Sequence, residues 1–111
     1  MFVPYLSGCF MFLRHSILRE VGVFDERFFM YPEDIDLTRR IAEGHKTIFY
    51  PKVLVYHNHG KASHQSLKML ILHFKNLVKY FNKWGWFFDK KRTFINNRAI
   101  KLLESGVNVT N

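Results

Sequence analysis

The 111-residue sequence contains a single cysteine, Cys9, so it cannot form an internal disulfide. So little cysteine is typical of a protein from a reducing compartment. Cys9 stands within an apolar run, where a packed thiol is more common than a reactive one. The composition therefore excludes the small disulfide-stabilised scaffolds.

The sequence also lacks an apolar run of the about 20 residues needed to span a bilayer. Residues 1–13 are apolar, but they have no basic leader and contain Pro4, Ser7 and Gly8, which is not typical of a signal peptide. Internal repeats and low-complexity segments are absent as well. We therefore expect a cytoplasmic protein, either soluble or peripheral at the inner face of the membrane.

Acidic residues are scarce, and the excess of basic residues is unevenly distributed. The whole chain has 17 Lys and Arg against 9 Asp and Glu. Residues 1–63 carry 8 basic and 7 acidic side chains, whereas residues 64–111 carry 9 and 2. The length allows one domain at most. The nearly neutral first part and the basic second part are therefore expected to have different roles.

Three of the few carboxylates, Glu33, Asp34 and Asp36, follow directly after an aromatic run that ends at Pro32. A carboxylate near the start of a helix and beside apolar rings can be tuned for base catalysis. Acidic residues are also common in a first helical turn, where they only stabilise the helix. The residues by themselves leave both interpretations open and favour the second.

Three motifs, in order along the chain, resemble those of the inverting family 2 glycosyltransferases. They are LSGCFM at residues 6–11, FDERFFMYPEDIDL at 24–37 and VYHNHG at 55–60. Such enzymes have the GT-A fold and transfer a sugar from a nucleotide-diphospho-sugar. The tail sequence YFNKWGWFF at residues 80–88 most resembles the rhamnosyltransferase-like members that build bacterial surface polysaccharide.

The resemblance implies a role for each matching polar residue. Asp34 would be the catalytic base that removes the proton of the acceptor hydroxyl, and Glu33 beside it would shape the pocket or hydrogen-bond a substrate hydroxyl. Ser7 and Gly8 would lie against the donor sugar and the acceptor. Asp36 would bind substrate or simply stabilise the helix.

The resemblance also implies a divalent cation, Mn²⁺ or Mg²⁺, with His57 as one ligand. Hard cations require several oxygen ligands. In this family they come from the diphosphate and from an acidic motif of the Asp-x-Asp type, and no such motif precedes Phe24 in this sequence. A zinc site formed by His57, His59 and His64 is the alternative, and it has little support because the usual ligand spacing is absent.

We therefore expect an α/β fold: a partial GT-A domain with short strands and a helical carboxy-terminal extension. Residues 1–63 would be the carboxy-terminal half of the catalytic domain, and residues 64–111 a basic amphipathic extension. The parent enzyme would transfer a sugar, rhamnose by the closer resemblance, to a saccharide or lipid-linked acceptor with inversion. The 111-residue fragment would be inactive, because the nucleotide-binding half is not within it.

Local patterns predict the individual elements. Short apolar runs predict strands over residues 8–13, 47–50 and 53–56. Helix signals predict a short helix capped by Ser16 and ended by Gly22, a helix from Glu33 ended by Gly44, a long helix from about Leu67 ended by Gly85, and a last helix capped by Asp89.

The long predicted helix has an apolar stripe and a second stripe of lysines, namely Lys68, Lys75, Lys79 and Lys83. Three uses remain open: packing on the catalytic domain, peripheral contact with an anionic membrane, and nucleic-acid binding. The sequence contains no recognised nucleic-acid motif, so no nucleic acid is expected. A non-enzymatic basic module that binds membrane or nucleic acid is the alternative to the transferase.

Overall fold

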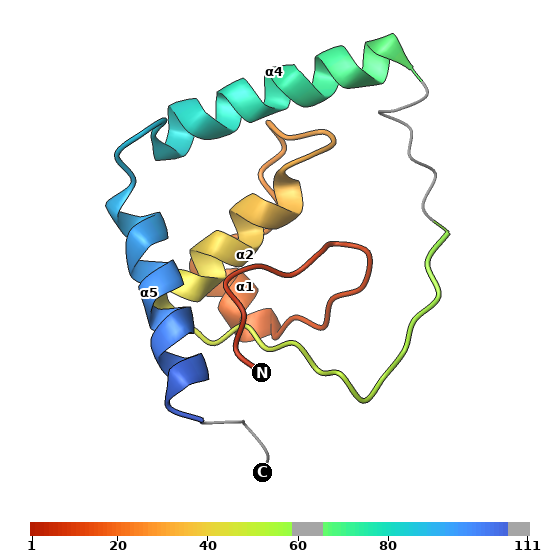
Figure 1. Cartoon of the computed structure of the whole chain (residues 1–111). Helices are drawn as coiled ribbons and strands as arrows, with labels where there is room; N and C mark the ends of the chain where they lie inside the picture. The colour runs from red at the N-terminus through yellow and green to blue at the C-terminus, as the bar shows by residue number, and fades with distance from the viewer. Residues whose placement is uncertain (59–65, 107–111) are drawn as a thin grey trace.

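The computed structural model describes residues 1–58 and 66–106 (Figure 1). The described residues form four helices: α1 (His15–Val21), α2 (Glu33–Gly44), α4 (Leu67–Trp84) and α5 (Lys90–Glu104). Both α1 and α5 pack against α2, and α4 crosses one end of the molecule (Figure 1). The proposed zinc ligands His59 and His64, and the predicted domain boundary after residue 63, lie outside the described residues.

The expected α/β fold with short strands is wrong, since residues 1–58 and 66–106 form no strand or sheet. Residues 8–13 are a surface loop in which Phe12 is 91% exposed. Residues 47–50 and 53–56 follow the surface, with one isolated antiparallel bridge, from Phe2 to Ile48. A strand needs a neighbour for its backbone hydrogen bonds, and only the first three residues of the chain supply one here.

The helices follow the predicted signals closely. α1 and α4 end at Gly22 and Gly85, whose φ angles of 83° and 106° favour glycine. Asp89 caps α5 as predicted, because its carboxylate accepts a 2.9 Å hydrogen bond from the amide of Arg92. The Ser16 cap is wrong, since Ser16 lies inside α1. None of these helices is long and apolar enough to cross a membrane, within the described part of the chain.

The core lies where α2 meets α5 and the first residues of the chain. Seven apolar side chains are buried there and around the turn before α2: Phe2, Phe28, Leu37, Ile41, Ala42, Ile95 and Ala99. The core is small for a chain of this length, and many large apolar side chains remain exposed.

A buried ion pair joins α2 to α5. The guanidinium of Arg39 donates to both carboxylate oxygens of Asp89 at 2.6 and 2.5 Å, and it lies 4.1 Å from the ring centroid of Trp84. Burial alone raises the pKa of the Asp89 carboxyl, but the hydrogen bonds from Arg39 and Arg92 outweigh it and leave that pKa below its ordinary value. Asp89 is therefore both a helix cap and an interhelical partner.

Candidate functional site

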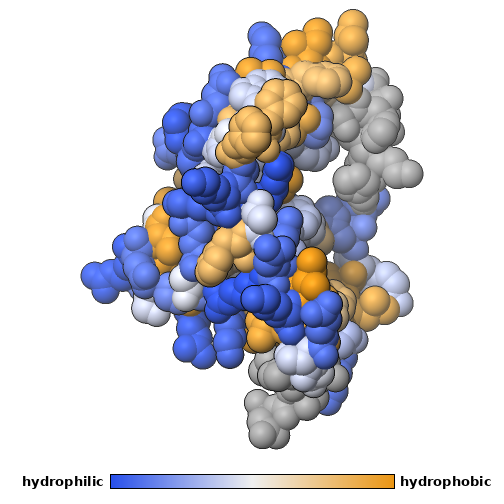
Figure 2. Space-filling view, turned by 60° about the vertical axis from the view of Figure 1, so that its left-hand side comes forward, coloured by the Kyte–Doolittle hydropathy of each residue, from blue (hydrophilic) through white to orange (hydrophobic). Residues whose placement is uncertain are grey.

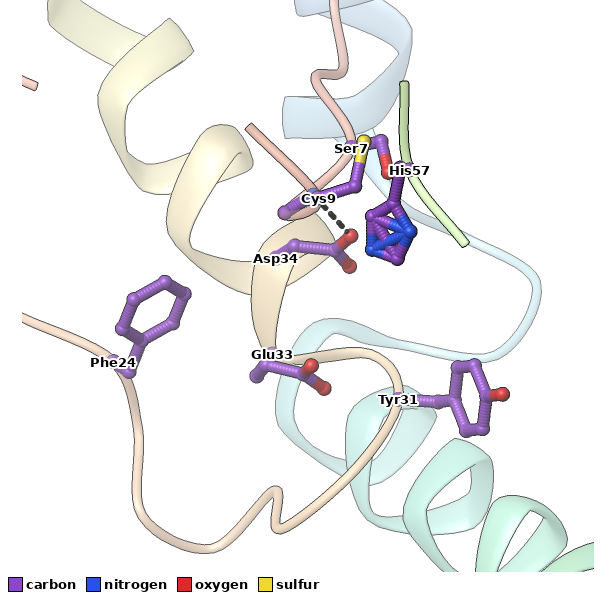
Figure 3. A pocket seen from close by; sticks show the side chains of 8 residues that line it. Ser7, Cys9, Phe24, Tyr31, Glu33, Asp34 and His57 are labelled. Atoms are coloured by element: carbon purple, nitrogen blue, oxygen red, sulfur yellow. Dashed lines mark hydrogen bonds between the residues drawn. The ribbon is translucent and has the colours of Figure 1, made fainter. Parts of the chain in front are cut away.

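An open pocket of about 600 Å³ lies at the amino-terminal end of α2 (Figure 3). Its lining comes from the first loop, the turn before α2, α2 itself and the extended segment after α2. These residues are Ser7, Gly8, Cys9, Phe24, Tyr31, Glu33, Asp34 and His57. The structure thus brings together five of the six predicted site residues, although they are spread over 50 positions in the sequence.

Three donors hold the carboxylate of Asp34. Its Oδ2 accepts hydrogen bonds from the amide of Gly8 at 2.8 Å and from the hydroxyl of Tyr5 at 2.9 Å. Its Oδ1 accepts from the amide of Ile35 at 2.8 Å, at the start of α2, where the helix dipole favours a negative charge. The Asp34 carboxylate therefore accepts a hydrogen bond in the first turn of α2 and also faces the pocket (Figure 3). Donors from two separate segments, residues 5–8 and the start of α2, fix the orientation of this carboxylate.

Tyr5 touches the predicted base, although the sequence motifs did not identify it. Partial burial, and then its hydrogen bond to Asp34, raise the pKa of Tyr5 to about 12. The phenol therefore stays protonated at neutral pH and remains a donor to the carboxylate. Tyr5 directly precedes the first motif, but no local pattern links it to Asp34, 29 positions away.

Glu33 also points into the pocket (Figure 3). Its Oε2 is buried and has no hydrogen-bond partner among the described residues. Leaving a buried acceptor unsatisfied costs about 1–3 kcal/mol. A ligand that donates an O–H or N–H to this oxygen would remove that cost, so Glu33 is suited to bind a hydroxyl-rich ligand.

The imidazole of His57 lines the same pocket as Ser7 and Asp34 (Figure 3). An imidazole nitrogen can bind a divalent cation when the ring is suitably held. However, no three His, Cys, Asp or Glu side chains in residues 1–58 and 66–106 form a group that could hold a metal ion. These residues can therefore offer one ligand but not a complete metal site.

Asp36 lies outside the pocket and is fully buried. Its carboxylate accepts from Trp84 Nε1 at 2.8 Å and forms ion pairs with Lys83 at 2.6 Å and Arg40 at 2.9 Å. Two of these partners belong to α4, so Asp36 attaches α4 to α2. The structure therefore gives Asp36 a packing role, and of its two predicted roles only the structural one has contacts here.

Half of this chain is similar to a curated enzyme. The sequence is 42% identical over 57 residues to "N-acetylglucosaminyl-diphospho-decaprenol L-rhamnosyltransferase" from two strains of Mycobacterium tuberculosis, CDC 1551 / Oshkosh and ATCC 25618 / H37Rv. This similarity supports a relationship between the chain and glycosyltransferases. The match covers 50% of this chain but 19% of each relative, so it supports a glycosyltransferase parent at a coarse level.

No protein-family model and no solved structure matches this chain. Membership of family 2 therefore stays a prediction. The sugar and the acceptor in the relatives' name are properties of those enzymes.

Proposed function

We propose that this chain carries the acceptor side of a sugar-transfer site in a family 2 type inverting glycosyltransferase. The parent would take a sugar from a nucleotide-diphospho-sugar and transfer it to a saccharide or lipid-linked acceptor, in surface polysaccharide synthesis in the cytoplasm. The relatives' name gives rhamnose and a diphospho-decaprenol-linked sugar as first candidates. The observation that carries the proposal is that Ser7, Gly8, Glu33, Asp34 and His57 line one and the same pocket.

Asp34 is the proposed general base. Three protein donors hold its two oxygens, which together have about four lone-pair positions, so room remains for a hydroxyl from the pocket. The acceptor hydroxyl gives its proton to Asp34 while its oxygen bonds to the anomeric carbon. The bond from that carbon to the diphosphate breaks, and the nucleoside diphosphate leaves with the electron pair. Attack opposite to the leaving group inverts the anomeric configuration.

The other pocket residues bind and orient the substrates in this proposal. The unpaired oxygen of Glu33 accepts a sugar hydroxyl. Ser7 offers a hydroxyl, and Gly8 keeps the backbone close to the base. Orientation of this kind contributes to the rate because the attacking oxygen must be aligned with the breaking bond.

A divalent cation is the proposed cofactor, and when bound it would neutralise charge on the departing diphosphate. His57 would supply one ligand. The remaining ligands would come from the diphosphate and from residues outside those described, since the described residues contain no complete group.

We further propose that residues 1–63 belong to the catalytic domain of the parent and that residues 64–111 are a basic extension. The chain spans about a fifth of the length of its curated relatives. Sugar transfer is therefore proposed for the parent enzyme, and the 111-residue chain alone is proposed to be inactive.

A transfer assay tests this function. The parent enzyme is incubated with a panel of nucleotide-diphospho-sugars and a polyprenyl-diphospho-N-acetylglucosamine acceptor, and the product linkage is determined by NMR. We expect one donor to give a product of inverted configuration, loss of product with a chelator, and recovery with Mn²⁺ or Mg²⁺. Absence of transfer across the panel, or a retained configuration, would overturn the proposal. Detectable transfer by the 111-residue chain alone would overturn its proposed inactivity.

Gly8 gives a sharper test of the pocket geometry. A Cβ at this position would lie 3.1 Å from Cβ of Asp34, closer than side chains normally pack, and 3.4 Å from its Oδ2. Gly8→Ala is therefore expected to displace the carboxylate by a few tenths of an ångström and to lower kcat by about 10-fold to 100-fold. The matched control is Gly44→Ala, where a Cβ meets nothing within 4 Å. Equal kcat values for the two variants would contradict the assigned position of the base.

A further inference from the structure

The apolar stripe of α4 faces away from the rest of the protein. Leu67 is 72% exposed and Phe74 is 60% exposed, and the other exposed members of the stripe are Leu70, Ile71 and Val78. Figure 2 shows hydrophobic side chains gathered at the top of the molecule, where α4 lies. An amphipathic helix normally buries this stripe. Residues 1–58 and 66–106 leave most of this stripe exposed.

The opposite side of α4 holds the helix in place through polar contacts. The amide of Asn76, the buried residue of this helix, donates to the backbone carbonyl of Met30 at 2.6 Å. Lys83 pairs with Asp25 at 2.8 Å and with Asp36 at 2.6 Å. These contacts fix the rotation of α4 about its axis, so the exposure of the stripe follows from specific bonds.

A row of lysines runs along one edge of the stripe. Lys68, Lys75 and Lys79 lie one residue after stripe positions 67, 74 and 78, and one residue corresponds to a rotation of about 100° around a helix. Within the described residues, no carboxylate pairs with any of these three lysines. Their positive charge is therefore available to a partner, and it lies beside the apolar surface.

A small basic pocket adjoins this edge of α4. It has a volume of about 360 Å³ and is lined by Arg27, Phe28, Lys79, Asn82 and Lys83. Asp25 neutralises part of this charge through Arg27 and Lys83. Lys79 donates to the backbone carbonyl of Arg27 at 3.2 Å and keeps its charge uncompensated. Such a pocket is suited to one phosphate group.

We propose that the outer face of α4, defined as its five stripe residues with Lys68, Lys75 and Lys79, binds the surface of an anionic phospholipid bilayer. The stripe enters the boundary between headgroups and acyl chains, and the lysines reach the lipid phosphates, one of which occupies the basic pocket. The complementary charge favours an anionic bilayer over a neutral apolar partner. Directly after α4, Trp86, Phe87 and Phe88 are exposed, and aromatic rings are favourable at a bilayer interface.

Sedimentation with vesicles tests the proposal. The protein is mixed with vesicles of phosphatidylglycerol and phosphatidylcholine, or of phosphatidylcholine alone, without donor or acceptor. We expect binding to the anionic vesicles that weakens as salt is raised. Lys75→Gln with Lys79→Gln is expected to lower the partition coefficient about 25-fold, because each basic side chain near the surface contributes about fivefold.

Two matched controls lie on α5. Lys90→Gln with Lys101→Gln changes the charge equally, and Phe94, 58% exposed, matches Phe74. Phe74→Ser is expected to weaken vesicle binding more than Phe94→Ser does, and the α5 lysine pair is expected to matter less than the α4 pair. Equal effects of the two pairs would overturn the proposal. So would self-association or binding of inorganic phosphate without vesicle binding. Because no substrate is present, this result stands apart from sugar transfer.

Discussion

Asp34→Asn is expected to lower the kcat of sugar transfer by the parent enzyme by about 10²–10⁴-fold, the usual contribution of a positioned general base. Asparagine has nearly the same shape as aspartate, and its carbonyl oxygen can still accept from the amide of Gly8 and the hydroxyl of Tyr5. Its amide nitrogen then takes the place of Oδ1 and loses the hydrogen bond from the amide of Ile35. It cannot take a proton from the acceptor. The loss should therefore appear in kcat with the donor KM nearly unchanged, and the thermal unfolding temperature should fall only by the effect of the one exposed hydrogen bond to Ile35.

Glu26→Gln is the control for this measurement. Glu26 belongs to the same sequence motif but is exposed and lies outside the pocket, and the substitution removes the same charge. Its kcat is expected to match that of the parent enzyme. A comparable loss in both variants would mean that net charge, and not the Asp34 carboxylate, controls the rate.

The non-enzymatic alternative predicts the opposite pattern. If the chain serves only as a basic binding module, Asp34→Asn should leave its activity unchanged and replacement of Lys75 and Lys79 should remove it. If the enzyme interpretation is right, Asp34→Asn removes turnover, while the lysine variants retain turnover on a water-soluble acceptor. One pair of variants therefore separates the two classes of function.

The success of the sequence predictions depended on how local the determining interactions are. α2, α4 and α5 were predicted correctly because helical hydrogen bonds join residues four apart and the ends carry their own signals, such as Gly85 and Asp89. The strands at residues 47–50 and 53–56 were wrong, because β-branched and aromatic residues favour a strand only where a partner strand is present.

Only part of the pocket was predicted, because local sequence patterns do not reveal contacts between distant segments. Short motifs identified Glu33, Asp34 and His57, but the bond between Tyr5 and Asp34 joins segments that no local pattern connects. The side of α4 that faces the protein was likewise not predictable. Periodicity reveals an apolar stripe, but it does not tell whether this stripe or the polar side packs against the other helices. Here Asp36 decides it, through its contacts with Lys83 and Trp84.

Asp89→Asn is expected to lower the free energy of unfolding by about 3–5 kcal/mol, the usual cost of removing one partner of a buried ion pair. The side chains of Arg39 and Asp89 are only 7% and 4% exposed, so the substitution leaves a buried guanidinium without its counter-charge. Asparagine caps a helix about as well as aspartate. The loss therefore reports the ion pair and not the start of α5, and urea unfolding followed by circular dichroism measures it.

Glu43→Gln provides the matched control, because Glu43 pairs with Lys91 at 2.8 Å across the same two helices but nearer to solvent. A surface pair of this kind contributes about 0–1 kcal/mol. If Asp89→Asn cost no more than Glu43→Gln, the Arg39–Asp89 pair would not be what joins α2 to α5.

The same ion pair predicts how stability changes with pH. The pKa of Asp89 is lowered in the folded protein, whereas the pKa of an aspartate in an unfolded chain is about 3.9. The contribution of the pair is therefore complete above about pH 5, and it is lost as the pH falls through the lower folded pKa. In Asp89→Asn this loss cannot occur, so the free energy of unfolding should fall less steeply with acid than in the unmodified protein. Parallel acid profiles for the two proteins would show that Asp89 is not ionised in the fold.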